Sequence, residues 1–276
     1  MRKSTTIYYL LFMVFCISCT PSENNSPEPI ISEENFRNIS ELVGHDVASF
    51  HYENGLLVKA LGNSGPDRDH FLMAIQVEYD SNKKVKRIIE SNDVFPKAEG
   101  FNFNLTDNIP NEGSDWYIYE HYYTNNKLTS IKRNGELEQE FFYDENGRVS
   151  RYVWYNNYNN PHSTKEEVYT YNNEGKMVSY TALNSISGEI AYGNILTDNK
   201  INPFYGLWKK NGFIMPGTFS HLTDFNIPFE PHNVIKVYEG EEVDYNMYYE
   251  YDGNYPNLYD ITTYRLDGPT YIKYLN

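Results

Sequence analysis

Cysteine is almost absent from this 276-residue chain, which contains two, Cys16 and Cys19. Two cysteines cannot build a disulfide scaffold or a thiolate zinc site. Basic residues are also few, because 23 Lys and Arg stand against 38 Asp and Glu and the formal net charge is −15. This charge excludes a nucleic-acid-binding protein, which needs a cationic face. Beyond the N-terminus, no run is long and apolar enough for a membrane-spanning helix.

Catalytic motifs with a fixed spacing are missing as well. The sequence has no Gly-rich phosphate loop and no Gly-x-Ser-x-Gly elbow. Its seven histidines include no His-x-x-x-His pair that could bind a metal. We therefore assign no catalytic residue, no metal site and no cofactor. Because 38 residues are acidic, a carboxylate pair for glycoside hydrolysis could still lie anywhere in the chain.

The N-terminus predicts export and lipid anchoring. Met-Arg-Lys precedes an apolar stretch from Ile7 to Ile17, and Ser18-Cys19 follows it. A cationic start, about ten apolar residues and a small residue are typical of a secretory signal. The small residue directly before Cys19 resembles the lipobox of bacterial lipoproteins, which implies that Cys19 is lipidated. Acyl chains such as palmitate would then anchor the chain to a membrane. The alternative is an ordinary signal peptide with an incidental Cys.

The expected organisation is a signal peptide over residues 1–18, a flexible tether over 19–32 and a single domain over 33–276. Residues 20–32 hold three Pro, three Ser, two Asn and two Glu, a composition that buries no core. Ser32, two Glu and Gly44 predict one short helix at the start of the domain. The expected location is the cell envelope, in the outer membrane, facing the periplasm or the surface.

The domain is predicted to be mainly all-β. A Tyr closes a β-rich run, an Asn/Asp/Gly turn follows, and another run begins. The flanking residues alternate, so that Tyr117, Tyr119, His121 and Tyr123 share one face of a strand and Glu120 lies on the other. We expect an antiparallel meander of Tyr-rich β-hairpins in a twisted sheet or open sandwich. The pattern recurs at Tyr52, Tyr79, Tyr123, Tyr143, Tyr171 and Tyr251.

One segment breaks this pattern. From about Leu183 to Pro231 the density of Pro and Gly predicts a long loop region. The spacing between the Tyr turns is also irregular, which excludes a propeller or a strict solenoid.

Several segments resemble known sequences. Tyr143-Asp-Glu-Asn-Gly-Arg-Val149 resembles the YD repeats of RHS-like proteins. An Asn-Pro-Phe segment at 202–204, an Asn-Val segment at 233–234 and a Tyr-x-Tyr-Asp hairpin with Tyr-Pro at 249–256 follow in order. This order is similar to that of a Bacteroidetes-type family of lipoproteins of unknown function, over about residues 45–276. The chain departs from the family at Pro231 and His232. The resemblance implies an antiparallel β fold and a lipid-anchored, exported protein, and it implies no activity.

Aromatic residues are abundant, with 27 Tyr, 15 Phe and 3 Trp. Many can form the core with their hydroxyls at its edge, but we expect one sheet face to leave some exposed. Trp154 is the expected centre of an aromatic ligand-binding patch with Tyr152, Tyr155 and Trp116, because aromatic faces stack on sugar rings. The sequence thus favours a non-catalytic protein that binds a glycan or another envelope protein. The alternatives are an envelope polysaccharide hydrolase and a structural spacer.

Overall fold

The structure is a computed structural model that describes residues 36–44, 47–64, 68–106, 116–156, 163–188, 190–216, 227–239, 242–261 and 269–275. The expected signal peptide, the tether and Cys19 lie outside the described residues. Within the described part of the chain, no helix has the length and hydropathy needed to cross a membrane.

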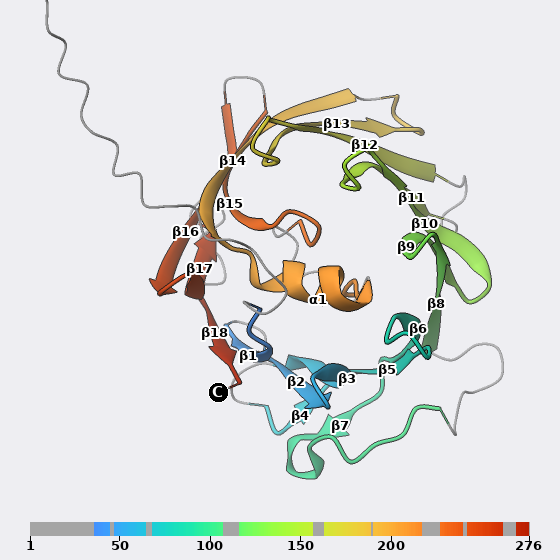
Figure 1. Ribbon diagram of the computed structural model, residues 1–276. Coiled ribbons are helices and arrows are strands. Elements are labelled where there is room, and N and C mark those ends of the chain that lie inside the picture. Colours follow the sequence, from blue (N-terminus) through green and yellow to red (C-terminus); the bar gives the residue numbers. More distant parts are fainter. Residues whose placement is uncertain are drawn as a thin grey trace, which may run out of the picture.

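Sixteen strands of the described chain close into one antiparallel barrel (Figure 1). Strands that follow one another along the chain pair throughout, and β18 pairs with β1 to close the ring. The barrel strands are β1 (Ile39–Val43), β2 (Val47–Glu53), β3 (Leu56–Ser64), β5 (Met73–Tyr79), β6 (Val85–Ser91), β8 (Trp116–Thr124), β9 (Lys127–Arg133), β10 (Glu136–Tyr143), β11 (Val149–Asn156), β12 (Ser163–Tyr171), β13 (Met177–Asn184), β14 (Ile190–Ile201), β15 (His232–Glu239), β16 (Glu242–Asp252), β17 (Tyr255–Ile261) and β18 (Thr270–Tyr274).

The all-β class is therefore confirmed, and the open sheet or sandwich is wrong. Closure removes both free edges, because the first and last strands satisfy each other's backbone groups. The pairing of β1 with β18 brings Leu42 opposite Ile272, two residues at opposite ends of the described chain.

The predicted Tyr hairpins are present, and their turns gather at one end of the barrel, here called the Tyr-turn end. Gly55, Gly147 and Gly175 have φ of 77°, 79° and 87° in these turns, a conformation that glycine adopts without strain. The closing Tyr side chains point inward, and Tyr79, Tyr123, Tyr143 and Tyr171 each donate to a backbone carbonyl of the preceding hairpin. The hydroxyl of Tyr171, for example, donates a hydrogen bond of 2.6 Å to the carbonyl of Val149.

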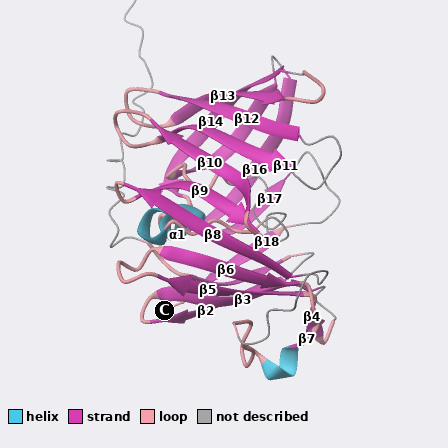
Figure 2. Cartoon of the chain, turned by 90° about the vertical axis from the view of Figure 1, so that its right-hand side faces the viewer, coloured by secondary structure: helices cyan, strands magenta, loops and turns pink. Residues whose placement is uncertain are grey.

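A helix lies inside the ring of strands near the Tyr-turn end (Figures 1 and 2). This helix, α1 (Pro203–Asn211), starts where the Asn202 side chain accepts a hydrogen bond from the Phe204 backbone N–H, and Gly212 ends it in the left-handed conformation. At the C-terminus of α1, Tyr123 of β8 donates to the carbonyl of Asn211 at 3.2 Å. The helix thus closes this end of the barrel.

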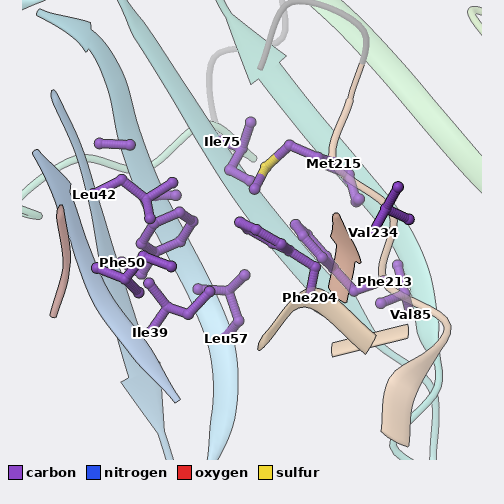
Figure 3. Close-up of a cluster of buried hydrophobic side chains, with 14 of the residues drawn as sticks. Ile39, Leu42, Phe50, Leu57, Ile75, Val85, Phe204, Phe213, Met215 and Val234 are labelled. Carbon is purple, nitrogen blue, oxygen red and sulfur yellow. The ribbon is translucent and has the colours of Figure 1, made fainter. Parts of the chain in front are cut away.

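The main hydrophobic core is the interior of the barrel around α1. Figure 3 shows Phe204, Phe213 and Met215, from α1 and the segment after it, facing Ile75 and other inward side chains of the first strands. Many inward side chains in this half are apolar and almost completely buried, among them Ile39, Leu42 and Ile75. Burial of this surface is the main source of stability for a fold whose strands are otherwise joined by local turns.

Two sequence predictions are corrected here. The short N-terminal helix is wrong, because residues 39–43 form β1, whose pairing with β18 and β2 outweighs the weak helix signals. The long loop over 183–231 is replaced in large part by β14 and α1. Two of the Pro and Gly residues there mark the ends of α1, since Pro203 opens the helix and Gly212 ends it.

The outer face of the barrel carries both polar and apolar side chains, and the exposed apolar ones include Tyr122, Phe142, Val168 and Tyr192. Arg151 and Glu166 form an outward ion pair at 3.5 Å, and Lys132 lies directly opposite Glu120.

A smaller apolar cluster lies on the outer face of β2, β3, β5 and β6. It is covered by the two-stranded ribbon of β4 (His70–Phe71) and β7 (Phe95–Pro96), followed by the 3₁₀ turn η2 (Lys97–Glu99). The buried members are Val47, Leu61, Phe71, Ala74, Ile89 and Leu105, and Trp116 packs against them.

Candidate binding site in the barrel lumen

Polar side chains gather inside the barrel in the half away from the Tyr-turn end. The strands β6, β8, β9 and β10 contribute them, at inward positions that alternate with outward ones. We call this group the lumen cluster: Glu90, Tyr119, His121, Arg133, Glu138 and Gln139. All but Arg133 are more than nine-tenths buried, and the Arg133 side chain is 15% exposed.

A β-bulge in β10 explains why two consecutive residues enter the lumen. The register between β9 and β10 shifts between Leu137 and Gln139, so that Leu137 lies opposite Lys132 and Gln139 lies opposite Ile131. Glu138 is the extra residue and turns inward beside Gln139, whereas Glu140 lies on the outer face again. Bulges commonly redirect a side chain in this way next to functional sites.

Glu138 is held by Arg133 and has a perturbed acidity. The two side chains form an ion pair at 3.2 Å, with the Glu138 carboxylate 5% exposed. Burial raises the pKa of Glu138 from 4.5 to about 7, and the charge of Glu90 adds to this, while Arg133 opposes it. Glu138 therefore changes charge near neutral pH, at a position inside the barrel.

His121 faces the same lumen two strands away. Its Nδ1 lies 3.4 Å from the backbone carbonyl oxygen of Tyr119, which can only accept a hydrogen bond. Burial lowers the pKa of His121 from 6.5 to about 4, so the ring is neutral at pH 7. With the proton on Nδ1, Nε2 is a hydrogen-bond acceptor.

Among the described residues, at least three buried acceptors of the lumen cluster have no hydrogen-bond donor: His121 Nε2, Glu138 Oε2 and Gln139 Oε1. A buried polar atom without a hydrogen bond costs about 1–3 kcal/mol, so three such atoms on neighbouring strands are candidates for hydrogen bonds from water or from a ligand. The register places them together, because His121 and Gln139 both lie opposite Ile131.

Aromatic and solvent-exposed residues border the lumen cluster on the inner face. Trp154 of β11 lies directly opposite Gln139. The Arg133 guanidinium lies over the Tyr117 ring, 4.8 Å from the ring centre. Lys165, which pairs with Trp154 across β11 and β12, forms a 2.7 Å ion pair with Glu167, and its side chain is 53% exposed. Because Lys165 stands at an inward position near the start of β12, solvent reaches the inner face at this end of the barrel.

The expected aromatic patch is divided between the two faces of the barrel wall. Tyr152 and Trp154 share the inner face, as the alternation predicts, and the Tyr152 ring packs 5.3 Å from Phe141. Tyr155 lies on the outer face, where its hydroxyl donates to Glu140 at 2.5 Å. Trp116 packs on the outer apolar cluster and donates to Asp93 at 2.8 Å. The structure thus brings Tyr152 and Trp154 together and leaves Tyr155 and Trp116 apart from them.

The residues that carry the family resemblance have structural contacts. Asn202 caps α1 and also donates to the carbonyls of Ile227 and Glu230 at 3.0 and 2.9 Å. The fully buried Glu230 accepts from the backbone N–H of Met177 at 3.0 Å and lies 3.1 Å from His232 Nδ1. These contacts hold α1 and the segment before β15 inside the barrel, so the motifs specify the fold.

Sequence reasoning placed Tyr119 and His121 on one face but assigned no site residue among Glu90, Arg133, Glu138 and Gln139. Only their positions across four neighbouring strands bring them together, and no local spacing reveals this. Among the described residues, no group of three or more His, Cys, Asp or Glu is arranged to hold a metal ion.

Comparisons with known proteins add the following. No family model and no curated protein matches the sequence. A porin-like protein from Bacteroides vulgatus is similar in structure, with a TM-score of 0.46 and 8% identity over 87% of this chain and 99% of that one. A porin-like protein from Bacteroides uniformis is similar with a TM-score of 0.37 and 9% sequence identity, over 86% of this chain and 98% of that one. The TcdB2-TccC3 structure is similar with a TM-score of 0.32 and 10% sequence identity, over 83% of this chain and 14% of that one.

Proposed function

We propose that this chain is an exported, lipid-anchored binding protein whose barrel lumen takes a small polar ligand. The observation that carries the proposal is the set of three buried acceptors without a described donor, His121 Nε2, Glu138 Oε2 and Gln139 Oε1. A ligand that donates hydrogen bonds to these three atoms would offset the free-energy cost of leaving them unpaired in the ligand-free protein. Trp154 and Tyr117 supply aromatic faces next to these atoms, as sugar-binding sites require.

The proposed location follows from the N-terminus and from the outer face. Lipid on Cys19 would anchor the chain, and residues 19–32 would let the domain stand away from the membrane. The acidic chain and the outward ion pairs, such as Arg151 with Glu166, suit a barrel surrounded by water. The proposed family remains the Bacteroidetes-type lipoproteins with YD-like hairpins.

The anchor is tested by replacing Cys19. In Cys19→Ala, we expect the protein to leave the membrane fraction and labelled palmitate to be absent, whereas the wild type and the control Cys16→Ala keep both. Membrane retention of Cys19→Ala with unchanged labelling would refute the lipid anchor.

The lumen site is tested by tryptophan fluorescence of the full chain during titration with neutral, acidic and amino monosaccharides. We expect at least one sugar class to change the emission saturably, and the response to disappear in Trp154→Phe, which removes the tryptophan opposite Gln139. Trp116→Phe is the matched control, because Trp116 packs on the outer cluster. A response that disappears in Trp116→Phe and persists in Trp154→Phe would move the site to the outer face.

A hydrolase is the second candidate, and one observation favours it. Glu138, whose pKa is raised to about 7, has the acidity of a general acid, and the charge of Glu90 acts on it inside the same lumen. Chromogenic nitrophenyl glycosides test this candidate. Turnover that Glu138→Gln abolishes and Glu140→Gln keeps would establish an enzyme, whereas no release of nitrophenol leaves the binding protein.

A further inference from the structure

Four exposed apolar side chains lie side by side on the outer face of β12, β13 and β14, and we call them the outer patch: Val168, Leu183, Ile190 and Tyr192. They are between 40% and 61% exposed. Val168 and Tyr192 both lie opposite Thr181, and Leu183 lies opposite Ile190, so two neighbouring rows of the sheet join them. Since a large apolar side chain has roughly 200 Å² of surface, these fractions correspond to about 400 Å² of exposed apolar surface. Patches of this size on a monomer are often interaction sites.

The outer patch differs in charge from its surroundings. Two other exposed aromatic rings of the outer face lie under a cation, with Lys132 Nζ 5.3 Å from the ring centre of Tyr122 and the Arg151 guanidinium 3.7 Å from that of Phe142. The outer patch itself contains no charged residue, and at its β12 border Arg151 and Glu166 pair with each other at 3.5 Å. Covering the patch therefore removes apolar surface from water and leaves no charge unpaired.

The net charge of the chain restricts which surfaces of two copies can meet. Each copy has a formal net charge of −15, so two copies repel each other where their acidic surfaces approach. An uncharged apolar patch is a surface on which two such copies can come into contact.

The outer patch lies far from the place where the described chain begins. Phe36 packs against Tyr205 of α1 at the Tyr-turn end, with the ring centres 5.7 Å apart. Leu183 and Ile190 lie at the end of β13 and the start of β14, at the other end of the barrel. The wall of β12 to β14 also stands across the ring from β1 (Figure 1). A tether that leads to Phe36 would attach the Tyr-turn end to the membrane, which makes lipid a poor partner for the patch.

On the proposed lipid anchor, we propose that the outer patch is the contact surface of a symmetric dimer, in which it packs against the same patch of a second copy. A two-fold axis along the membrane normal brings the two patches face to face and keeps Phe36 of both copies on the membrane side. A stable dimer buries about 800 Å² per partner, and the patch supplies about half of this, so the dimer is weak. Anchoring both copies in one membrane raises their effective concentration and favours this contact.

Disulfide cross-linking in membranes tests the dimer with the full chain. In the proposed mature protein Cys16 has left with the signal peptide and Cys19 carries lipid, so an engineered Cys is the one free thiol. Thr181→Cys places this thiol at the centre of the outer patch. Val94→Cys is the control, because Val94 is 61% exposed and follows β6 on a distant part of the wall. After oxidation with copper phenanthroline, we expect at least tenfold more disulfide-linked dimer from Thr181→Cys than from Val94→Cys, and none from the wild type.

A charge in the patch locates the contact. In the Thr181→Cys chain, Ile190→Glu should reduce the linked dimer at least tenfold, because two like charges would then face each other across the contact. Val94→Glu is the matched control and should leave the dimer unchanged. Ile190 and Val94 are 50% and 61% exposed, so neither change removes a buried side chain, and the melting temperature of each variant checks this. The contrast between the two Cys variants decides the inference even if Ile190→Glu does not fold.

The outcomes separate this inference from the proposed function. If Thr181→Cys stays monomeric, or cross-links no more than Val94→Cys, the dimer is refuted and the anchor stands. If Ile190→Glu folds and leaves the linked dimer unchanged, the outer patch does not make the contact and the inference is also refuted. If the wild type itself forms linked dimers, Cys16 or Cys19 is a free thiol and the proposed anchor fails. The contrast between Thr181→Cys and Val94→Cys, repeated with both native Cys replaced by Ala, then decides the dimer.

Discussion

Arg133 Nη1 lies 3.2 Å from Glu138 Oε1 inside the barrel, and the two residues come from the adjacent strands β9 and β10. Their side chains are 15% and 5% exposed, so this ion pair is largely shielded from water. A charge at such a position is costly even with a partner. This cost is the physical origin of the raised pKa of Glu138, and it makes the protein's stability depend on pH in a defined direction.

We expect Glu138 to reduce stability as the pH rises. Its pKa is about 7 in the folded chain against an ordinary 4.5, so the folded state binds the extra proton between these values. The contribution of this proton to the free energy of unfolding is on the order of 3 kcal/mol. It is fully present below pH 4.5 and is lost as the pH rises to about 7. Urea unfolding from pH 4 to 8 measures it as the difference between the wild type and Glu138→Gln. A difference that stays constant with pH contradicts the buried position of Glu138.

His121 should have the opposite effect on folding stability over an overlapping range of pH. Its pKa is about 4 in the folded chain against an ordinary 6.5, so the unfolded chain binds the extra proton between these values. The stability that the neutral ring allows is present above pH 6.5 and is lost as the pH falls towards 4. In His121→Gln this loss should be absent. Equal pH profiles of His121→Gln and the wild type would argue against burial of the imidazole.

The inward hydroxyls of the closing Tyr residues should each stabilise the barrel modestly. Tyr171→Phe loses the 2.6 Å hydrogen bond to Val149 and should cost about 1 kcal/mol of unfolding free energy. Tyr192→Phe, at an outward position that is 61% exposed, is the control and should change it by less than about 0.5 kcal/mol. Chemical denaturation measures both, and equal stability of the two variants would mean that the inward hydroxyl contributes nothing.

Gly147 should tolerate some residues and not others. Its φ of 79° is strained for a β-branched side chain, so Gly147→Val should cost about 1 kcal/mol or more. Gly147→Asn should cost less, because Asn54, Asn125 and Asn134 adopt φ of 50° in hairpin turns of this chain. Thermal unfolding measures both variants. Equal melting temperatures for Gly147→Val and the wild type would contradict the hairpin turn at this place.

The hairpins could be predicted from the sequence because each is local. A closing Tyr, an Asn/Asp/Gly turn and alternating flanks lie within a few residues, as at Tyr143 and Gly147, and the structure confirms them. Closure of the barrel could not be predicted, since it depends on Leu42 meeting Ile272. No local pattern specifies a pairing over that separation. The helix α1 has local signals, Asn202 as N-cap, Pro203 at the first position and Gly212 at the end, but Pro and Gly equally favour a loop.

The lumen cluster was predictable in part. Alternation placed Tyr119 and His121 on one face, and that face is the inner one. The bulge that turns Glu138 inward beside Gln139 has no signature in the sequence, because strict alternation would send one of them outward. Tyr152 and Trp154 were correctly placed on one face. Their separation from Trp116 depends on which face of each strand turns inward, and this is decided by the closed barrel.

A crystal structure of the chain soaked with the monosaccharide that changes its tryptophan emission tests the central claim most directly. The account predicts electron density for the sugar inside the barrel, with donors within hydrogen-bonding distance of Glu138 Oε2 and Gln139 Oε1 and a ring face against Trp154. Ordered water alone at these acceptors, or a sugar bound on the outer face beside Trp116, would contradict a ligand site in the lumen.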